Sequence, residues 1–158
     1  MNTLKEQYKL VLGSREVLLN YCGTLTTSDL TKEIDSFKKS SVMYMLLHIA
    51  NTYLFWLKRF AFNQEFEYFS VENVKDIEGV IKAFDEVNIA VNKFFDSELK
   101  SSKLIEGEIF WLKKNMSYSV LELFTHVITH EFHHKGQIMT MTRLLGYTPP
   151  DTDVIRFG

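Results

Sequence analysis

The chain has 158 residues, of which 46% are apolar and 24% charged, and its formal net charge is −2. These values predict one soluble globular domain over residues 1–158, and they exclude a broad electrostatic attraction to nucleic acid or to an anionic membrane. Cys22 is the single cysteine, which excludes an internal disulfide and favours a reducing, cytoplasmic location.

Helix-compatible sequence fills most of the chain, because its only two prolines are adjacent, at positions 149 and 150. Apolar residues at three- and four-residue steps predict four helices, over residues 4–22, about 40–62, 72–99 and 119–145. The intervening residues are predicted as loops, with a short helical turn in 24–39 and an extended stretch at 108–112. We therefore predict an all-α protein, a four-helix bundle.

The second and fourth predicted helices have distinct features. Residues 42–57 carry no charge, but this run is shorter than the ~20 residues of a membrane span and is predicted to be a buried core helix. Ser119 and Glu122 form a capping-box sequence at the start of the last helix. Gly146 and the proline pair end that helix.

Four of the five histidines fall within residues 125–138 of the last helix. His130 and His134 are four residues apart, which places them on one helix face, where two imidazoles can share a metal ion. His48, on the apolar face of the second helix, supplies a third ligand. Three histidines without a thiolate predict an open coordination position, as catalytic metal sites have. Imidazole suits zinc, copper, nickel and iron, and zinc or nickel is expected first.

Each of these histidines also has a simpler interpretation. A lone His48 would be read as a buried histidine bonded to a backbone carbonyl, and the histidine cluster as an exposed polar stripe. His126 is compatible with a fourth ligand, a partner behind the ligands or a core residue. His133 is predicted to point elsewhere, towards the pocket rim or a neighbour. Two charged residues of this helix, Glu131 and Lys135, are predicted to face outward or to pair with each other.

Residues 130–134 also match the zinc-peptidase pattern H-E-x-x-H, in which the glutamate is the general base. The extended pattern requires glycine and histidine where this chain has Gln137 and Thr140. The third histidine lies upstream, at His48, instead of downstream. The peptidase interpretation is therefore the weaker one.

Three stretches together identify a resemblance. Residues 46–50, Leu-Leu-His-Ile-Ala, look like one ligand segment, and residues 126–138 look like a second, in which the last histidine precedes a basic residue, glycine and glutamine. The ending over residues 145–155, Leu-Gly-Tyr-Thr-Pro-Pro-Asp-Thr-Asp-Val-Ile, is similar too. Over nearly its whole length the chain resembles the DinB/YfiT-like superfamily of damage-inducible helical metalloproteins. Lys135 stands where arginine is commoner there, and Thr129 where asparagine is frequent.

The resemblance implies a four-helix bundle in up-down-down-up order, often a homodimer, with His48, His130 and His134 as metal ligands. Characterised relatives include metal-dependent S-transferases that use bacillithiol and mycothiol-dependent isomerases. The expected function is thus a metal-dependent enzyme that transfers a low-molecular-weight thiol to an electrophile, both small molecules. The alternative is a non-enzymatic metal-binding stress-response protein. Three further side chains are expected as pocket walls: Trp56, Trp111 and Tyr118.

Overall fold

The computed structural model describes residues 3–98 and 103–156, and this part of the chain is mostly helical. It contains five α-helices and one two-stranded sheet. The elements are α1 (Thr3–Cys22), α2 (Thr27–Thr31), the 3₁₀ turn η1 (Asp35–Phe37), α3 (Val42–Leu54), the π-helical segment η2 (Phe55–Phe60), α4 (Ile77–Glu98), β1 (Ile105–Ile109), β2 (Lys114–Tyr118) and α5 (Val120–Leu144).

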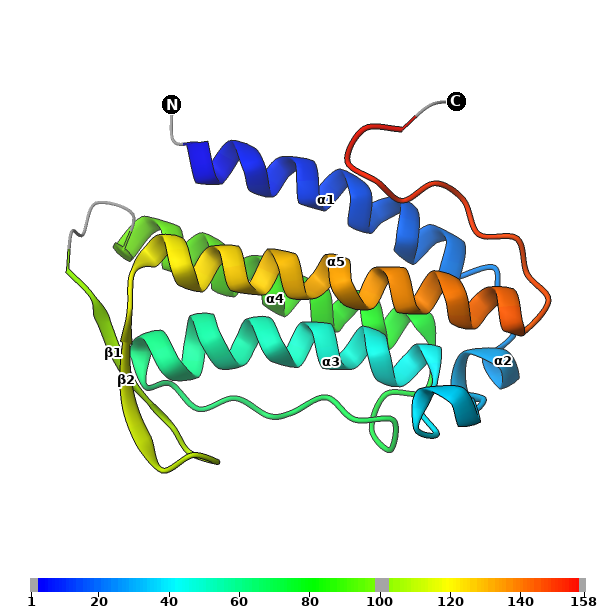
Figure 1. The fold of residues 1–158 in the computed structure, drawn as a ribbon, viewed down its shortest axis with the longest axis horizontal. Coiled ribbons are helices and arrows are strands. Elements are labelled where there is room, and N and C mark those ends of the chain that lie inside the picture. Colours follow the sequence, from blue (N-terminus) through cyan, green and yellow to red (C-terminus); the bar gives the residue numbers. More distant parts are fainter. Residues whose placement is uncertain (1–2, 99–102, 157–158) are drawn as a thin grey trace.

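The four long helices lie side by side (Figure 1). In this view α1 and α5 run in one direction along the long axis, whereas α3 and α4 run in the other. The small sheet lies at one end, beside the end of α3 and the start of α5. The segment after α5 turns back over α1, where Ser14 Oγ donates a hydrogen bond to the carbonyl of Thr152.

The helix that carries most histidines begins and ends as its sequence predicts. Ser119 Oγ accepts from the Glu122 backbone N–H at 3.2 Å, and Glu122 Oε2 accepts from the Ser119 N–H at 2.8 Å, so both halves of the capping box are present. At the other end, Gly146 has φ +92°, a left-handed conformation that glycine adopts without a steric cost.

The other long helices differ from their predicted boundaries. α4 begins at Ile77 rather than near residue 72, because the Asp76 carboxylate accepts the Gly79 N–H at 2.9 Å and so caps the helix there. Its predicted end, residue 99, lies outside the described residues. The second predicted helix is composite: after Leu54 the backbone continues as the π-helical η2 to Phe60.

The prediction of an all-α chain is wrong for residues 105–118, which form an antiparallel hairpin instead of an irregular connection. Gly107 explains how closely the hairpin packs: a Cβ there would lie 2.6 Å from the Phe60 carbonyl oxygen and 2.8 Å from the Phe60 ring. Only glycine permits this approach of β1 to η2. The predicted extended stretch 108–112 contributes the end of β1 and part of the turn.

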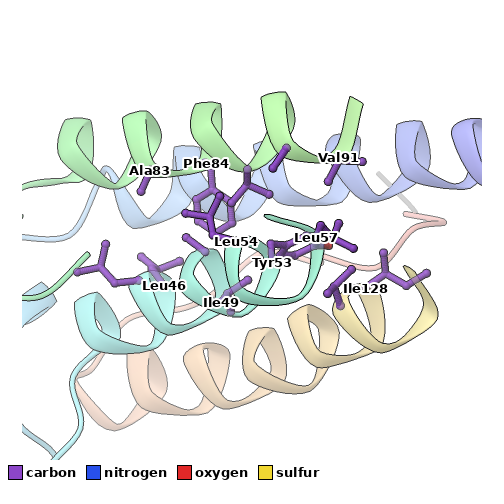
Figure 2. Close-up of a cluster of buried hydrophobic side chains, with 14 of the residues drawn as sticks. Leu46, Ile49, Tyr53, Leu54, Leu57, Ala83, Phe84, Val91 and Ile128 are labelled. Carbon is purple, nitrogen blue, oxygen red and sulfur yellow. The ribbon is translucent and has the colours of Figure 1, made fainter. Parts of the chain in front are cut away.

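α3 is the central core helix that its uncharged sequence predicts. Figure 2 shows Leu46, Ile49 and Tyr53 of α3 directed towards side chains of α4 and α5. Leu46, Ile49 and Tyr53 are each 0% exposed, as is Val91 of α4. No helix in the described part of the chain is both long enough and apolar enough to cross a membrane.

Candidate metal centre

Three histidines from two helices converge between α3 and α5. The Nε2 atoms of His48 and His130 lie 3.0 Å apart, and the ring of His134 lies 4.7 Å from that of His48 and 4.4 Å from that of His130, centroid to centroid. One ring nitrogen from each residue falls within a group whose members all lie within 4.8 Å of one another. All three residues are half-buried, so each keeps part of its surface accessible to solvent.

Local structure orients the two rings that α5 contributes. His130 and His134 are one turn apart on α5, which places both on the face that looks at α3. His134 Nδ1 lies 2.6 Å from Gln137 Oε1, an acceptor, so Nδ1 carries the proton and Nε2 is left as the ligating nitrogen. Thr52 Oγ1 donates to the His48 carbonyl at 2.8 Å and lies 3.2 Å from His130 Nε2.

The site favours neutral imidazoles, the protonation state that binds a metal ion. Burial, followed by the nearby His134 and His48, lowers the pKa of His130 to about 4. Burial and then His134 lower the pKa of His48. Burial also lowers the pKa of His134, although its bond to Gln137 opposes that shift.

The donor set fits a divalent ion of the borderline-soft kind. Two nitrogens bound to one tetrahedral zinc at ~2.05 Å would be ~3.3 Å apart, close to the observed spacing of His48 and His130. Three imidazoles leave one tetrahedral position for water or substrate. The three-histidine group could therefore hold a metal ion.

The other two histidines are placed differently. His133 is exposed and is not part of the three-histidine group, although its ring centroid lies 4.9 Å from that of His134. His126 lies one turn before His130, with ring centroids 5.7 Å apart, and is not part of the three-histidine group. Its ring contacts Trp56 instead, at a centroid distance of 5.0 Å.

Two of the three aromatic residues predicted as pocket walls share a cavity. Trp56 and Tyr118 line a space of about 290 Å³ together with His126. Trp111 does not line it; its ring packs against Phe55 at 4.7 Å and is 55% exposed in the turn of the hairpin.

Glu131 does not face outward, and it does not pair with Lys135 as predicted. It is 0% exposed, and its carboxylate accepts from Arg15 Nε at 2.9 Å, from Arg15 Nη2 at 2.8 Å and from Tyr53 Oη at 2.5 Å. Because these bonds direct the carboxylate into the core, away from the His130–His134 face, Glu131 is not placed to act as the base of an H-E-x-x-H peptidase.

Lys135 is also buried, with 2% of its surface exposed. Its ammonium donates to Ser14 Oγ and lies 3.9 Å from the centre of the Phe132 ring. Glu131 and Lys135 were both expected to face outward. They instead contact Arg15 and Ser14 of α1, and so attach α5 to α1.

Several residues that support the site were missed by sequence reasoning. Thr52 and Gln137 contact the histidine rings, but sequence reasoning gave neither of them a role. Nothing in the spacing of Thr52 indicates one, whereas Gln137 was noted only as the glutamine that ends the motif after His134. Arg15 carried a usable signal, because it falls on the apolar face of the first helix beside Val11 and Leu18. An arginine there requires a buried acid, and Glu131 supplies it.

Comparisons with known proteins agree with this architecture. A model of the DinB family matches residues 1–158. The chain is also 22% identical over 143 residues to the uncharacterized protein YizA of Bacillus subtilis (strain 168), a match that covers 89% of this chain and 87% of YizA. That name states no activity, so the match adds only to the evidence for the family. Because the family model spans the whole chain, this protein belongs to the DinB family.

Proposed function

We propose that this protein binds one divalent metal ion through His48, His130 and His134 and uses it to transfer a low-molecular-weight thiol to an electrophile. The observation that carries the proposal is the convergence of three half-buried imidazoles, with one nitrogen of each within 4.8 Å of the others. Two of them come from α5 and one from α3. Such a set binds zinc or nickel well and leaves one coordination position open.

The ion would supply acidity, because a bound divalent cation lowers the pKa of a coordinated thiol or water. The protein residues supply the arrangement. His48, His130 and His134 would hold the ion through neutral rings. Gln137 fixes the tautomer of His134, and the Thr52 hydroxyl contacts the ring of His130 and helps to orient it. The three residues are half-buried, which leaves the group partly accessible to a substrate.

Metal analysis and a thiol assay test the proposal together. We expect purified protein to contain about one zinc or nickel ion per chain. Protein treated with a chelator should not consume a thiol with chlorodinitrobenzene as the electrophile, and adding the metal back should restore this activity. His130→Ala should lose metal and activity. His133→Ala is the matched control, because His133 lies on the same helix but outside the three-histidine group. Equal metal content in both variants would contradict the assignment.

The alternative is a protein that keeps the metal only for stability, which the position of the site between α3 and α5 also permits. In that case chelation should lower the melting temperature, while none of the common thiols is consumed in either state. The H-E-x-x-H peptidase has no such support, since the Glu131 carboxylate is held by Arg15.

The remaining expectations belong to the same proposal. We propose a four-helix bundle in up-down-down-up order, which the helix directions in Figure 1 support. We also propose a homodimer in the cytoplasm that acts on small molecules. Light scattering of the purified protein would give its mass in solution, and a monomer at all concentrations would contradict the dimer.

A further inference from the structure

A cavity of about 290 Å³ lies next to the three-histidine group. We call this cavity the aromatic slot; five side chains line it: Trp56, Tyr118, Glu122, Leu123 and His126. Leu123 is 2% exposed and forms part of its apolar wall. Three of the five are rings, so most of the lining is apolar or aromatic. Its volume lies just below the ~300–1,000 Å³ range of small-molecule pockets, so it suits a small guest.

The rings of the slot meet edge to face. The Trp56 ring lies 5.8 Å from that of Tyr118 at 81°, and 5.0 Å from that of His126 at 72°. Perpendicular neighbours leave π faces available for a flat guest, which aromatic side chains bind in offset-stacked or edge-to-face geometry. Trp56 belongs to the π-helical η2, a backbone form that recurs at functional sites.

The slot and the candidate metal centre share one wall. His126 lines the slot, and its ring is 5.7 Å from that of His130 in the three-histidine group. Trp56 also follows Thr52 by about one helical turn, and the Thr52 hydroxyl lies 3.2 Å from His130 Nε2. The slot therefore adjoins the three-histidine group through the His126 ring, whose centroid lies 5.7 Å from that of His130.

We propose that the aromatic slot binds the planar, uncharged aromatic part of the electrophile, a one- or two-ring group. This inference rests on the proposed S-transfer and names its second substrate by chemical class. For a halogenated nitroaromatic, the thiolate sulfur forms a bond to the ring carbon while the carbon–halogen bond breaks. Halide leaves with the electron pair, and the proton of the thiol passes to solvent.

Glu122 gives the slot a preference for uncharged guests. Glu122 lines the slot, and its Oε2 atom accepts from the Ser119 N–H at 2.8 Å and from Ser119 Oγ at 2.7 Å. These two bonds hold the pKa of Glu122 below its ordinary value, so the group is ionised at neutral pH. An anionic ring, such as dinitrobenzoate, should bind more weakly than neutral meta-dinitrobenzene, and Glu122→Gln should reduce the difference.

The test uses full-length chelated protein, so that binding does not depend on the metal. In a Trp111→Phe background, Trp56 is the only tryptophan, since the chain has two. Meta-dinitrobenzene, which has no leaving group, should quench Trp56 fluorescence saturably. Tyr118→Ala should weaken this binding at least tenfold. Tyr68→Ala is the matched control, because Tyr68 lines a different cavity, of about 300 Å³, beside His48.

The outcomes are distinct. Linear, non-saturating quenching, or a loss of binding in Tyr68→Ala instead of Tyr118→Ala, would overturn the slot. If Tyr118→Ala does not fold, the deciding measurement is an NMR titration of the unmodified protein with meta-dinitrobenzene, in which changes in the amide chemical shifts locate the bound molecule. Shifts confined to Trp56, Leu123 and His126 support the slot, and shifts elsewhere overturn it. Saturable binding without metal-dependent turnover would refute the proposed function alone, whereas turnover without saturable binding would refute the slot alone.

Discussion

The guanidinium of Arg15 and the carboxylate of Glu131 form a two-point ion pair in the core, with N–O distances of 2.9 and 2.8 Å and side-chain exposures of 3% and 0%. Arg15→Met should destabilise the protein by ~3–5 kcal/mol, because it leaves a buried carboxylate without its cation. Lys5→Met is the matched control: its 2.8 Å bridge to Asp96 is exposed and should cost only ~0–1 kcal/mol. Urea unfolding followed by circular dichroism gives both values, and equal costs would contradict a buried pair.

Lys135 should make the stability of the protein depend on pH. Burial lowers its pKa to about 8 from 10.5; Glu131 opposes that shift, while Arg15 and Arg156 add to it. Between these values the unfolded chain holds a proton that the folded chain has lost, so the free energy of unfolding should rise with pH. For one group the slope is at most about 1.4 kcal/mol per pH unit. Lys135→Met should remove this rise.

The measurement for Lys135 is a series of urea titrations of chelated protein from pH 7.5 to about 10. Other lysines and tyrosines contribute equally to both proteins, so the difference between their slopes isolates Lys135. Lys9→Met, which removes an exposed lysine of α1, should keep the unmodified slope. Identical slopes for Lys135→Met and the unmodified protein would show that the ammonium is not held in the buried position.

The features that sequence predicted well are those set by local chemistry. The cap at Ser119 and the stop at Gly146 act within one helical turn, so the sequence near them was enough to predict where the last helix begins and ends. The same holds for His130 and His134, whose shared face follows from helix geometry alone. The prediction for His48 required one further step. Two histidines are too few to bind a metal ion tightly, and His48, alone on the apolar face of another helix, was the candidate for the third ligand. Its distance from His130 in the structure confirms that the two converge.

The features that sequence missed depend on contacts between distant segments. The hairpin over residues 105–118 packs against η2 through the close approach of Gly107 to Phe60, a contact that sequence periodicity does not reveal. Glu131 and Lys135 looked like a solvent-exposed pair because their four-residue spacing is also that of surface ion pairs. Only the position of α1, which brings Arg15 and Ser14 against α5, shows that they are buried.

Cys22 should be chemically inert in the folded protein. It is 0% exposed, and burial raises the pKa of its thiol to about 12, so almost no thiolate exists near neutral pH. Ellman's reagent should therefore react with it only at the rate of unfolding, whereas the unfolded chain in urea should react completely and at once. Rapid labelling of native protein, with an unchanged circular dichroism spectrum, would place the thiol at the surface.

Gln137 should control metal affinity without binding the metal. Its Oε1 atom lies 2.6 Å from His134 Nδ1 and so selects the tautomer whose Nε2 is free to ligate. Gln137→Leu should weaken zinc binding ~10–100-fold, the usual effect of losing a partner behind a ligating histidine. Gln137→Glu should retain binding, because a carboxylate accepts the same proton. Competition against a chelator of known affinity measures the change.

The control for Gln137 is Gln7→Leu, the same substitution at an exposed position of α1. Both leucine variants should melt at similar temperatures without metal, since Gln137 is only half-buried. The variants should differ once zinc is added, because binding to the native state raises stability in proportion to the logarithm of the affinity. Equal zinc affinity in both would mean that His134 keeps its tautomer unaided, and that the metal centre needs no support from this turn of α5.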